Sequence, residues 1–553
     1  MKERLKRNIF FIIFAIILII LDLMLVSIQN YDNIIIQNQY DNDIATNRTP
    51  SLDYYEMLDN KSKIDNSKEF ISTTNKIILI PSIIFLLLFI TVDFEKLKAD
   101  KIFLIIFVPI ALLYTFVIPI GGVPDEHTHW YRSYEISLGH LFSDKNEKNF
   151  GGRVLSSKLK TVLSTDYKLP EIINVSNYIP HDSYKKIEIR YKDGLKQKYS
   201  EEFIVFSNTA LYPAICYFPQ SAGIAISRFF TSSLMVQAYC ARIANLIVYT
   251  AIMWYAIKKI PFKKIGLLVV TFLPIVFQEA ISMSLDGLLM AFSTLLISYT
   301  LYLTYDSKTE KLSIKDYIIL TISSIFTAIT KIVYLPLCLI IYLIPKEKFK
   351  SAKTKYIILT LIFVVVTILD VIIMASSLGY DNMIASPDAN AFEQLKNILT
   401  RPVQFILVIL ATIRKFGVET VLSMFGNKLS WEDINISPIY VFALLIISLY
   451  YTFCENIENK QISLPIKIFS GLLTLITILA ILVTEYLTIT AYGYFYILGI
   501  QGRYFIPLLI LIYLACSNNI LMKQNKNLPK KYLLMFFVLA NIHSLTYIMY
   551  KYL

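Results

Sequence analysis

Long apolar runs recur along this 553-residue chain, and they restrict what it can fold into more than any other feature. Hydrophobic residues make up 56% of the sequence and the mean hydropathy is +0.56, which is too apolar for a soluble globular protein. A helix of about 20 apolar residues crosses a bilayer. The sequence therefore predicts an all-α polytopic membrane protein with about 13 transmembrane helices, at residues 9–29, 76–94, 102–120, 233–257, 265–279, 284–304, 316–330, 332–345, 356–378, 437–454, 466–484, 503–517 and 532–552.

Basic residues cluster in short loops between these runs, at residues 1–7, 95–101, 258–264, 305–316, 346–355 and 522–531. With the predicted spans, all of these loops fall on the side of the N-terminus, which the positive-inside rule makes cytoplasmic. The bias toward Lys, Ile, Asn and Tyr suggests an AT-rich bacterial genome, so we expect a multi-pass protein of a bacterial cytoplasmic membrane. The net charge of +12 then reflects orientation and contact with membrane lipids, and we expect no nucleic acid partner.

The opposite, extracytoplasmic side would hold three large pieces. Residues 30–76 form a polar loop, residues 121–232 form a large loop after the third span, and residues 375–438 include Ser386-Pro387-Asp388 and an apolar stretch that suits the membrane interface. We divide the chain into an N-terminal two-span segment at 1–101 and a transmembrane domain at 102–552. The first apolar run is too long for a signal peptide and is interpreted as a retained span.

The large loop opens with a dense polar cluster. Residues 120–132 read Ile-Gly-Gly-Val-Pro-Asp-Glu-His-Thr-His-Trp-Tyr-Arg, which places Asp125, Glu126, His127, His129 and Arg132 where a span meets water. Charged groups are costly near a bilayer, so such a cluster suggests a site, with a solvated loop start as the alternative. Two imidazoles are too few for a zinc site, which favours hydrogen-bonding roles for the histidines. No cofactor is certain, and a divalent cation stays open.

Further polar residues lie at the predicted outer ends of later spans, where they would ring one outward-facing cavity: Arg242, Glu279, Asp286, Lys331, Tyr334, Gln501, Arg503 and Tyr504. Each has a structural alternative. Asp286 is suited to capping the helix that follows it. Lys331 and Arg242 are long enough to snorkel. Arg503 has Glu485 and Glu279 as potential ion-pair partners.

Several common enzyme signatures are missing. The sequence has no GxGxxG after a strand, no P-loop, no HExxH and no GxSxG, which argues against an ATP-driven machine or a Rossmann-type nucleotide-sugar enzyme. The five cysteines are scattered without a CxxC pair, which predicts buried free thiols.

Four motifs carry a family resemblance. They are Val-Pro-Asp-Glu-His-Thr-His-Trp-Tyr-Arg-Ser-Tyr (123–134), Tyr-Pro-Ala-Ile-Cys-Tyr-Phe-Pro-Gln from Tyr212 to Gln220, Ser-Leu-Asp (284–286) and Ile-Gln-Gly-Arg-Tyr-Phe-Ile-Pro (500–507). From about residue 102 to 552 the chain resembles the bacterial membrane family called domain of unknown function 2142. That family is similar to polytopic GT-C glycosyltransferases, which take a sugar from a polyprenyl-phosphate lipid and pass it to an acceptor outside the membrane. The acidic motif of that class often follows the first span, whereas here it follows the third.

The resemblance implies that Asp125 and Glu126 correspond to the acidic loop motif. We expect glycosyl transfer to a cell-envelope glycan or related acceptor, with Asp125 as the first choice of base and Glu126 the second. Arg503, supported by Arg242 and Lys331, would bind the donor phosphate. Binding or supporting roles are expected for His127, His129, Arg132, Tyr212, Gln220, Glu279, Asp286, Tyr334, Gln501 and Tyr504. A transporter or flippase of a lipid-linked glycan is the main alternative, and a non-catalytic scaffold is the third.

Overall fold

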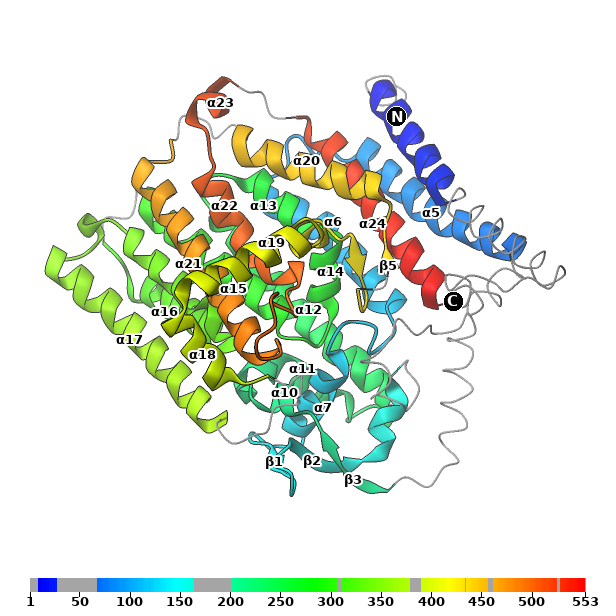
Figure 1. Cartoon of the computed structure of the whole chain (residues 1–553). Coiled ribbons are helices and arrows are strands. Elements are labelled where there is room, and N and C mark those ends of the chain that lie inside the picture. Colours follow the sequence, from blue (N-terminus) through cyan, green and yellow to red (C-terminus); the bar gives the residue numbers. More distant parts are fainter. Residues whose placement is uncertain are drawn as a thin grey trace.

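A computed structural model describes residues 8–26, 67–163, 200–306, 311–377, 389–432, 434–455, 461–524 and 528–552, and most of them are helical (Figure 1). Within these ranges, seven helices are long and apolar enough to cross a membrane: Ile9–Val26, α6 (Ala99–Val117), α12 (Leu234–Lys259), α15 (Asp286–Tyr305), α17 (Ala352–Ser377), α21 (Leu464–Thr488) and α24 (Lys530–Tyr552). The predicted multi-pass, all-α membrane fold is confirmed at this level.

The other predicted spans are shorter or broken helices. α13 (Lys264–Thr271) and α14 (Pro274–Ile281) bend by 67° at their junction, which is the geometry of a broken span or of a re-entrant loop. The break falls where Pro274 begins the second helix, since proline lacks an amide hydrogen and suits a first helical turn. The rest are α5 (Ser67–Thr91), α16 (Ile314–Thr330), η3 (Ile332–Leu343), α20 (Pro438–Cys454), and η5 (Gly502–Leu508) with α22 (Leu509–Ala515). Each predicted span thus contains helix, and a total of 13 crossings stays a prediction.

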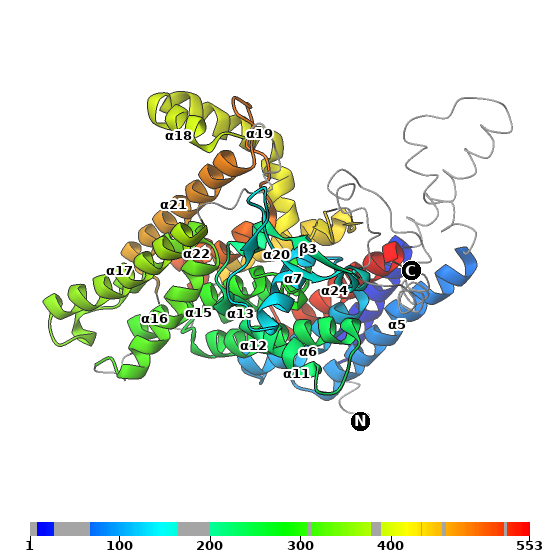
Figure 2. The same cartoon turned by 90° about the horizontal axis from the view of Figure 1, so that it is seen from below.

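The centre of the bundle is α15, which packs against α12, α16 and η3. In the most apolar stretch of α15, 83% of the residues are buried inside the protein, compared with 22% in the corresponding stretch of α17. A helix that is apolar all round needs neighbours on every side, whereas a helix at the edge of the bundle can present its apolar residues to lipid. Figure 2 shows α17 at the outer edge and α15 inside it.

Lysines join several of the predicted cytoplasmic loops in pairs. Lys530 Nζ donates to the carbonyl oxygens of Glu95 and Leu97 at 2.9 and 3.1 Å, and Lys348 bonds to the carbonyl of Asp306. Lys531 Nζ reaches Asn8 Oδ1 at 2.8 Å, at the start of the first helix. These contacts join loop 522–531 to loop 95–101 and to the first helix, and loop 346–355 to loop 305–316. That all basic loops share one face stays a prediction. The short helices η4 (Lys346–Lys348) and α23 (Asn519–Gln524) lie in these loops.

The large loop between α6 and α12 folds into a small α/β subdomain (Figure 1). A three-stranded antiparallel sheet has the order β1-β2-β3. Position 152 requires glycine because a Cβ there would lie 2.1 Å from the carbonyl oxygen of Ile204 on the neighbouring strand. The elements are α7 (Glu126–Ser137), β1 (Asp144–Lys145), β2 (Gly151–Ser156), η1 (Ser157–Val162), β3 (Glu201–Val205), α10 (Ser207–Ala210), η2 (Ala214–Tyr217) and α11 (Phe218–Ser227).

The third predicted outer piece contains α18 (Ala391–Thr400), α19 (Pro402–Met424), and a hairpin of β4 (Lys428–Leu429) and β5 (Ile434–Asn435). The predicted loop at 30–76 lies mostly outside the described residues. So do Ser386, Pro387, Asp388 and part of the large loop.

Candidate functional site

A left-handed turn presents Asp125 at the start of α7. Asp125 has φ +62°, a conformation that most L-residues avoid but that short polar side chains tolerate. Its carbonyl oxygen accepts from the amides of Thr128 and His129 at 3.0 and 3.2 Å, which fixes the turn to the helix. The Asp125 side chain stays 47% exposed. The local backbone therefore holds one accessible carboxylate at the mouth of the polar cluster.

The neighbouring carboxylate, Glu126, has the opposite environment. Arg242 Nε donates to Glu126 Oε1 at 2.7 Å and Arg242 Nη2 to Oε2 at 2.5 Å, and both side chains are completely buried. Glu126 also accepts from the amides of Gly121 and Met283 at 2.8 and 3.2 Å. Four bonds fill the acceptor capacity of the carboxylate.

The Arg242 guanidinium also forms hydrogen bonds with the backbone at the end of α6. Its guanidinium donates to the carbonyl oxygens of Thr115, Ile118 and Pro119 at 3.1, 2.5 and 2.9 Å. The C-terminal carbonyls of a helix lack partners within the helix, and here a buried cation supplies them. The geometry does not fit the predictions of Glu126 as a second base and Arg242 as a phosphate ligand. The hydrogen bonds between the two side chains and to nearby backbone groups leave neither side chain available to a substrate.

Arg503 is the centre of the second charge cluster. Its guanidinium lies 3.4 Å from Asp125 Oδ2, 3.4 Å from Asp286 Oδ2 and 3.6 Å from Glu279 Oε1. Lys331 Nζ forms an ion pair with Asp286 Oδ1. We call these five residues the Arg503 cluster. Asp125, from the third predicted span's end, thus meets groups from α14, α15, the α16–η3 junction and η5, as the sequence predicts.

Burial is graded across the Arg503 cluster. The Glu279, Arg503 and Asp286 side chains are 0%, 6% and 9% exposed, whereas Lys331 is 22% and Asp125 is 47% exposed. Arg503 is therefore more buried than the Asp125 carboxylate and the Lys331 ammonium. Asp286 begins α15 but makes no side-chain cap bond there, so the predicted capping alternative is wrong.

Two tyrosines lie beside the cations, Tyr504 partly exposed and Tyr334 fully buried. Lys331 Nζ lies 4.7 Å from the centre of the Tyr504 ring, a cation–π distance. Tyr334 Oη donates to the Tyr504 carbonyl at 2.7 Å, which ties η3 to η5. The side-chain oxygen of Gln501 is buried without a hydrogen-bond partner. Gly502 allows the close approach of α19, because a Cβ there would lie 2.5 Å from the Met424 amide nitrogen.

The β4–β5 hairpin covers the turn before Asp125. Trp431 Nε1 donates to the Gly121 carbonyl at 2.9 Å, and Ser430 Oγ donates to the Gly122 carbonyl at 2.8 Å. Burial raises the pKa of Glu432, in the same hairpin, against the opposing charge of Arg503. Sequence reasoning missed Trp431 and Glu432 as site residues, because only the fold brings this hairpin to the motif at 120–132.

Of the two motif histidines, His129 is a buried ring and His127 is partly exposed. His129 Nδ1 lies 2.8 Å from Tyr217 Oη, and burial lowers the pKa of His129 to about 4. Burial also lowers the pKa of His127, whose Nδ1 has no hydrogen-bond partner and whose ring lies 5.8 Å from that of Trp431. Within the described ranges no group of three or more His, Cys, Asp or Glu side chains has the arrangement of a metal site. The expected hydrogen-bonding role fits His129, whose partner Tyr217 the sequence analysis did not single out.

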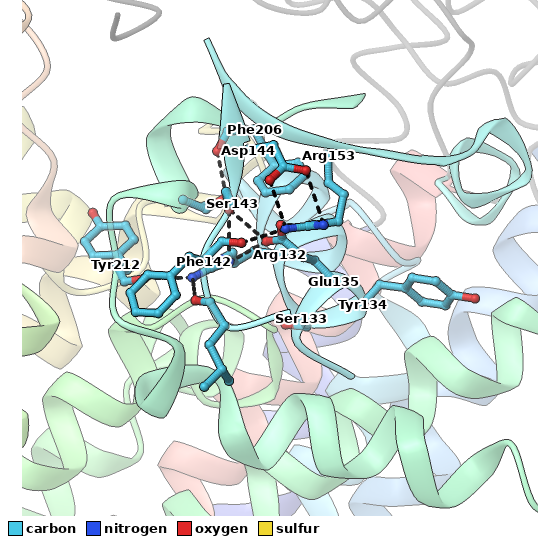
Figure 3. Close-up of polar contacts among 12 residues, drawn as sticks. Arg132, Ser133, Tyr134, Glu135, Phe142, Ser143, Asp144, Arg153, Phe206 and Tyr212 are labelled. Atoms are coloured by element: carbon cyan, nitrogen blue, oxygen red, sulfur yellow. Dashed lines mark hydrogen bonds and ion pairs between the residues drawn. The ribbon is translucent and has the colours of Figure 1, made fainter. Parts of the chain in front are cut away.

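Arg132 and Tyr212 belong to a network that fastens α7 to the sheet (Figure 3). The fully buried carboxylate of Glu135 lies between Arg132 and Arg153, and Arg153 Nε donates to it at 2.6 Å. Arg132 Nη2 donates to the carbonyls of Leu141 and Tyr212 at 2.8 and 3.4 Å. Arg132 therefore supports the helix that carries Asp125 and does not reach the Arg503 cluster.

Gln220 also has a supporting position. Its side-chain nitrogen donates to the Met283 carbonyl at 3.3 Å, and the Met283 amide donates to Glu126. This contact links α11 to the turn between α14 and α15.

Comparison with known proteins gives one match. The profile of a family described as "Predicted membrane protein (DUF2142)" matches residues 107–512, a range that contains every residue of the Arg503 cluster. No curated protein matches. No solved structure matches.

Proposed function

The chain belongs to the DUF2142 family of predicted membrane proteins, and we propose that it is a glycosyltransferase of the GT-C type. It would move a sugar from a polyprenyl-phosphate lipid to a cell-envelope glycan or related acceptor. The carrying observation is the accessible Asp125 carboxylate 3.4 Å from the Arg503 guanidinium. A proton acceptor and a phosphate-binding cation thereby face the same space.

Transfer needs three changes at the reacting atoms. The acceptor hydroxyl loses its proton to Asp125, the acceptor oxygen bonds to the anomeric carbon, and the bond from that carbon to the phosphate oxygen breaks. The electron pair leaves with polyprenyl phosphate, so no nucleotide is consumed. A carboxylate within hydrogen-bond reach of the hydroxyl accelerates such a step by about 10²- to 10⁴-fold. Direct attack from one face inverts the anomeric carbon.

Asp125 is a better base than Glu126 because only Asp125 has room for a substrate proton. Its side chain is 47% exposed, whereas Glu126 is fully buried and bonded to Arg242 and two backbone amides. We therefore assign the base to Asp125 alone. Glu126 and Arg242 hold the turn in place from beneath.

Arg503 and Lys331 are the proposed donors to the leaving phosphate. The three ion-pair distances of Arg503 are 3.4 to 3.6 Å, and its Nε has no hydrogen-bond partner. Charge-assisted bonds are usually about 2.7–2.9 Å long, so these are loose contacts that a phosphate can replace with shorter bidentate bonds. The Glu126–Arg242 hydrogen bonds, at 2.5 and 2.7 Å, are shorter and leave no such room for a phosphate.

Membrane placement supports the same function. The Arg503 cluster lies at the opposite ends of its helices from the lysine-rich loops, and the positive-inside rule assigns those loops to the cytoplasm. We propose that the site faces outward from a bacterial cytoplasmic membrane, where lipid-linked sugars serve as donors. The partly exposed ring of Tyr504 beside Lys331 suits stacking on a sugar ring, and the buried Tyr334 supports it through the hydrogen bond to the Tyr504 carbonyl.

The test is release of polyprenyl phosphate by the purified full chain in lipid nanodiscs. A panel of polyprenyl-phosphate sugars is supplied with glycan acceptors, and the lipid product is measured. The proposal predicts release that depends on an acceptor and on Asp125. Movement of labelled donor lipid across the bilayer without any release would overturn it in favour of a flippase.

A further inference from the structure

A separate cavity opens between the α/β subdomain and the start of α12. Its volume is about 430 Å³, within the range of small-molecule sites, and it shares no lining residue with the Arg503 cluster. Tyr134 of α7, Lys158 of η1, Gln237 of α12 and two residues of the α11–α12 turn, Arg228 and Thr231, line it.

The cavity lining that the structure describes includes two cations. Lys158 and Arg228 line it, and none of the other described lining residues is charged. Arg228 is held in place, because its guanidinium donates to the Ser137 carbonyl and hydroxyl oxygens at 2.9 and 2.6 Å and lies 4.7 Å from the Tyr134 ring centre. Those two bonds use two of its five N–H groups, so a fixed cation keeps donors for an anion.

One buried acceptor in the cavity has no partner. Gln237 is 4% exposed, and its Oε1 makes no hydrogen bond, while its Nε2 donates to the Thr231 carbonyl at 3.4 Å. Leaving a buried acceptor unsatisfied costs about 1–3 kcal/mol, so a ligand that brings a hydroxyl donor recovers that cost. The lining therefore matches a ligand with both an anionic group and a hydroxyl.

The neighbouring surface indicates that the ligand comes from the membrane. Phe229 is 91% exposed and Phe230 is 67% exposed, directly after Arg228 and at the end of a candidate span. Aromatic side chains at the end of a span lie at the level of lipid headgroups. The cations next to them lie where a lipid phosphate lies.

We propose that this cavity binds the headgroup of an anionic, hydroxyl-bearing phospholipid of the phosphatidylglycerol class. Lys158 and Arg228 hold the phosphodiester, Gln237 accepts from a glycerol hydroxyl, and Phe229 and Phe230 contact the acyl chains. This site is independent of the transferase proposal.

Binding of short-chain lipids to the purified full chain, measured by native mass spectrometry, tests the proposal. Dihexanoyl phosphatidylglycerol is compared with dihexanoyl phosphatidic acid, dihexanoyl phosphatidylcholine and inorganic phosphate. We expect phosphatidylglycerol to bind about tenfold more tightly than phosphatidylcholine, because both carry the phosphodiester but phosphatidylcholine replaces the glycerol hydroxyl with a quaternary ammonium that the cationic lining repels. Equal binding of those two lipids, or inorganic phosphate competing as well as the lipid, would overturn it.

Two variants assign the effect to the cavity. Lys158→Gln should weaken both anionic lipids about tenfold, whereas Gln237→Leu should remove only the advantage of phosphatidylglycerol over phosphatidic acid. The exposed Lys148→Gln is the matched control and should change neither. Unchanged lipid preference in both cavity variants, with the chain folded, would contradict the site.

Discussion

Arg503 Nη2 lies 3.4 Å from Asp125 Oδ2, although the two residues are 378 positions apart in the chain. The contact joins the turn after α6 to the start of η5, and the same guanidinium reaches Asp286 and Glu279. Two adjacent carboxylates, Asp125 and Glu126, thereby enter two different ion pairs. One pair is loose and accessible, and the other is tight and buried.

The buried pair should be a stability element. Glu126→Gln leaves Arg242 as an uncompensated buried charge, so we expect a loss of about 3–5 kcal/mol. A thermal unfolding scan in detergent measures this as a lower melting temperature. The double variant Glu126→Leu/Arg242→Met removes both charges but leaves the three carbonyls and two amides that the pair satisfies without partners, so it should recover only part of the loss. A single variant as stable as the parent would show that the pair is not structural.

Lys331 should contribute to donor binding. Its ammonium is the more exposed cation of the Arg503 cluster, and losing one charge-assisted contact to phosphate weakens binding about tenfold. We expect Lys331→Gln to raise the KM for the lipid donor more than it lowers kcat. Lys396→Gln, at an exposed position on α18, is the control. An unchanged donor KM would remove Lys331 from the phosphate site.

His129 should make the fold sensitive to acid. Its pKa is lowered to about 4, whereas in the unfolded chain it is about 6.5. As pH falls from about 6.5 to 4, His129 therefore takes up a proton in the unfolded state but stays neutral in the folded state. The free energy of unfolding drops by about 3 kcal/mol over that pH range. His129→Gln should flatten this part of the stability–pH curve. The exposed His140→Gln should leave it unchanged, and an unaltered curve in His129→Gln would refute the assignment.

Gly502 should be intolerant of a side chain. A Cβ there would meet Ser423 Oγ at 2.3 Å and the Met424 amide nitrogen at 2.5 Å, so η5 must move and carry Arg503 with it. We expect Gly502→Ala to lower both activity and melting temperature. At Gly471 a Cβ would meet Ala515 at an ordinary 3.7 Å, and Gly471→Ala should be tolerated. Full activity of Gly502→Ala would mean that the position of η5 is not critical.

Much of the fold follows from the sequence, because apolar length and lysine placement are local properties. They predict the helical segments and the common face of the basic loops. The break at Pro274 splits the single predicted span at 265–279 into the two short helices α13 and α14, which bend by 67°. The three-stranded sheet of the large loop depends on pairing between residues such as Gly152 and Val205, which no local pattern indicates.

The sequence predicts which residues gather at the candidate site, but it does not predict which of them form ion pairs with one another. Position relative to the spans brings Asp125, Asp286, Lys331 and Arg503 to one level, and the ion pairs place them together. The helical phase of α12 turns Arg242 toward Glu126 and away from Arg503, which changes Arg242 from a candidate ligand into a support.

The division of labour between the two motif carboxylates is tested most directly by polyprenyl phosphate release in matched single variants. Asp125→Asn should lose about 10²- to 10⁴-fold in kcat while keeping the parent's melting temperature. The exposed Glu147→Gln should be unchanged in both. An Asp125→Asn protein that is folded and turns over donor at the parental rate would contradict the assignment of Asp125 as the base.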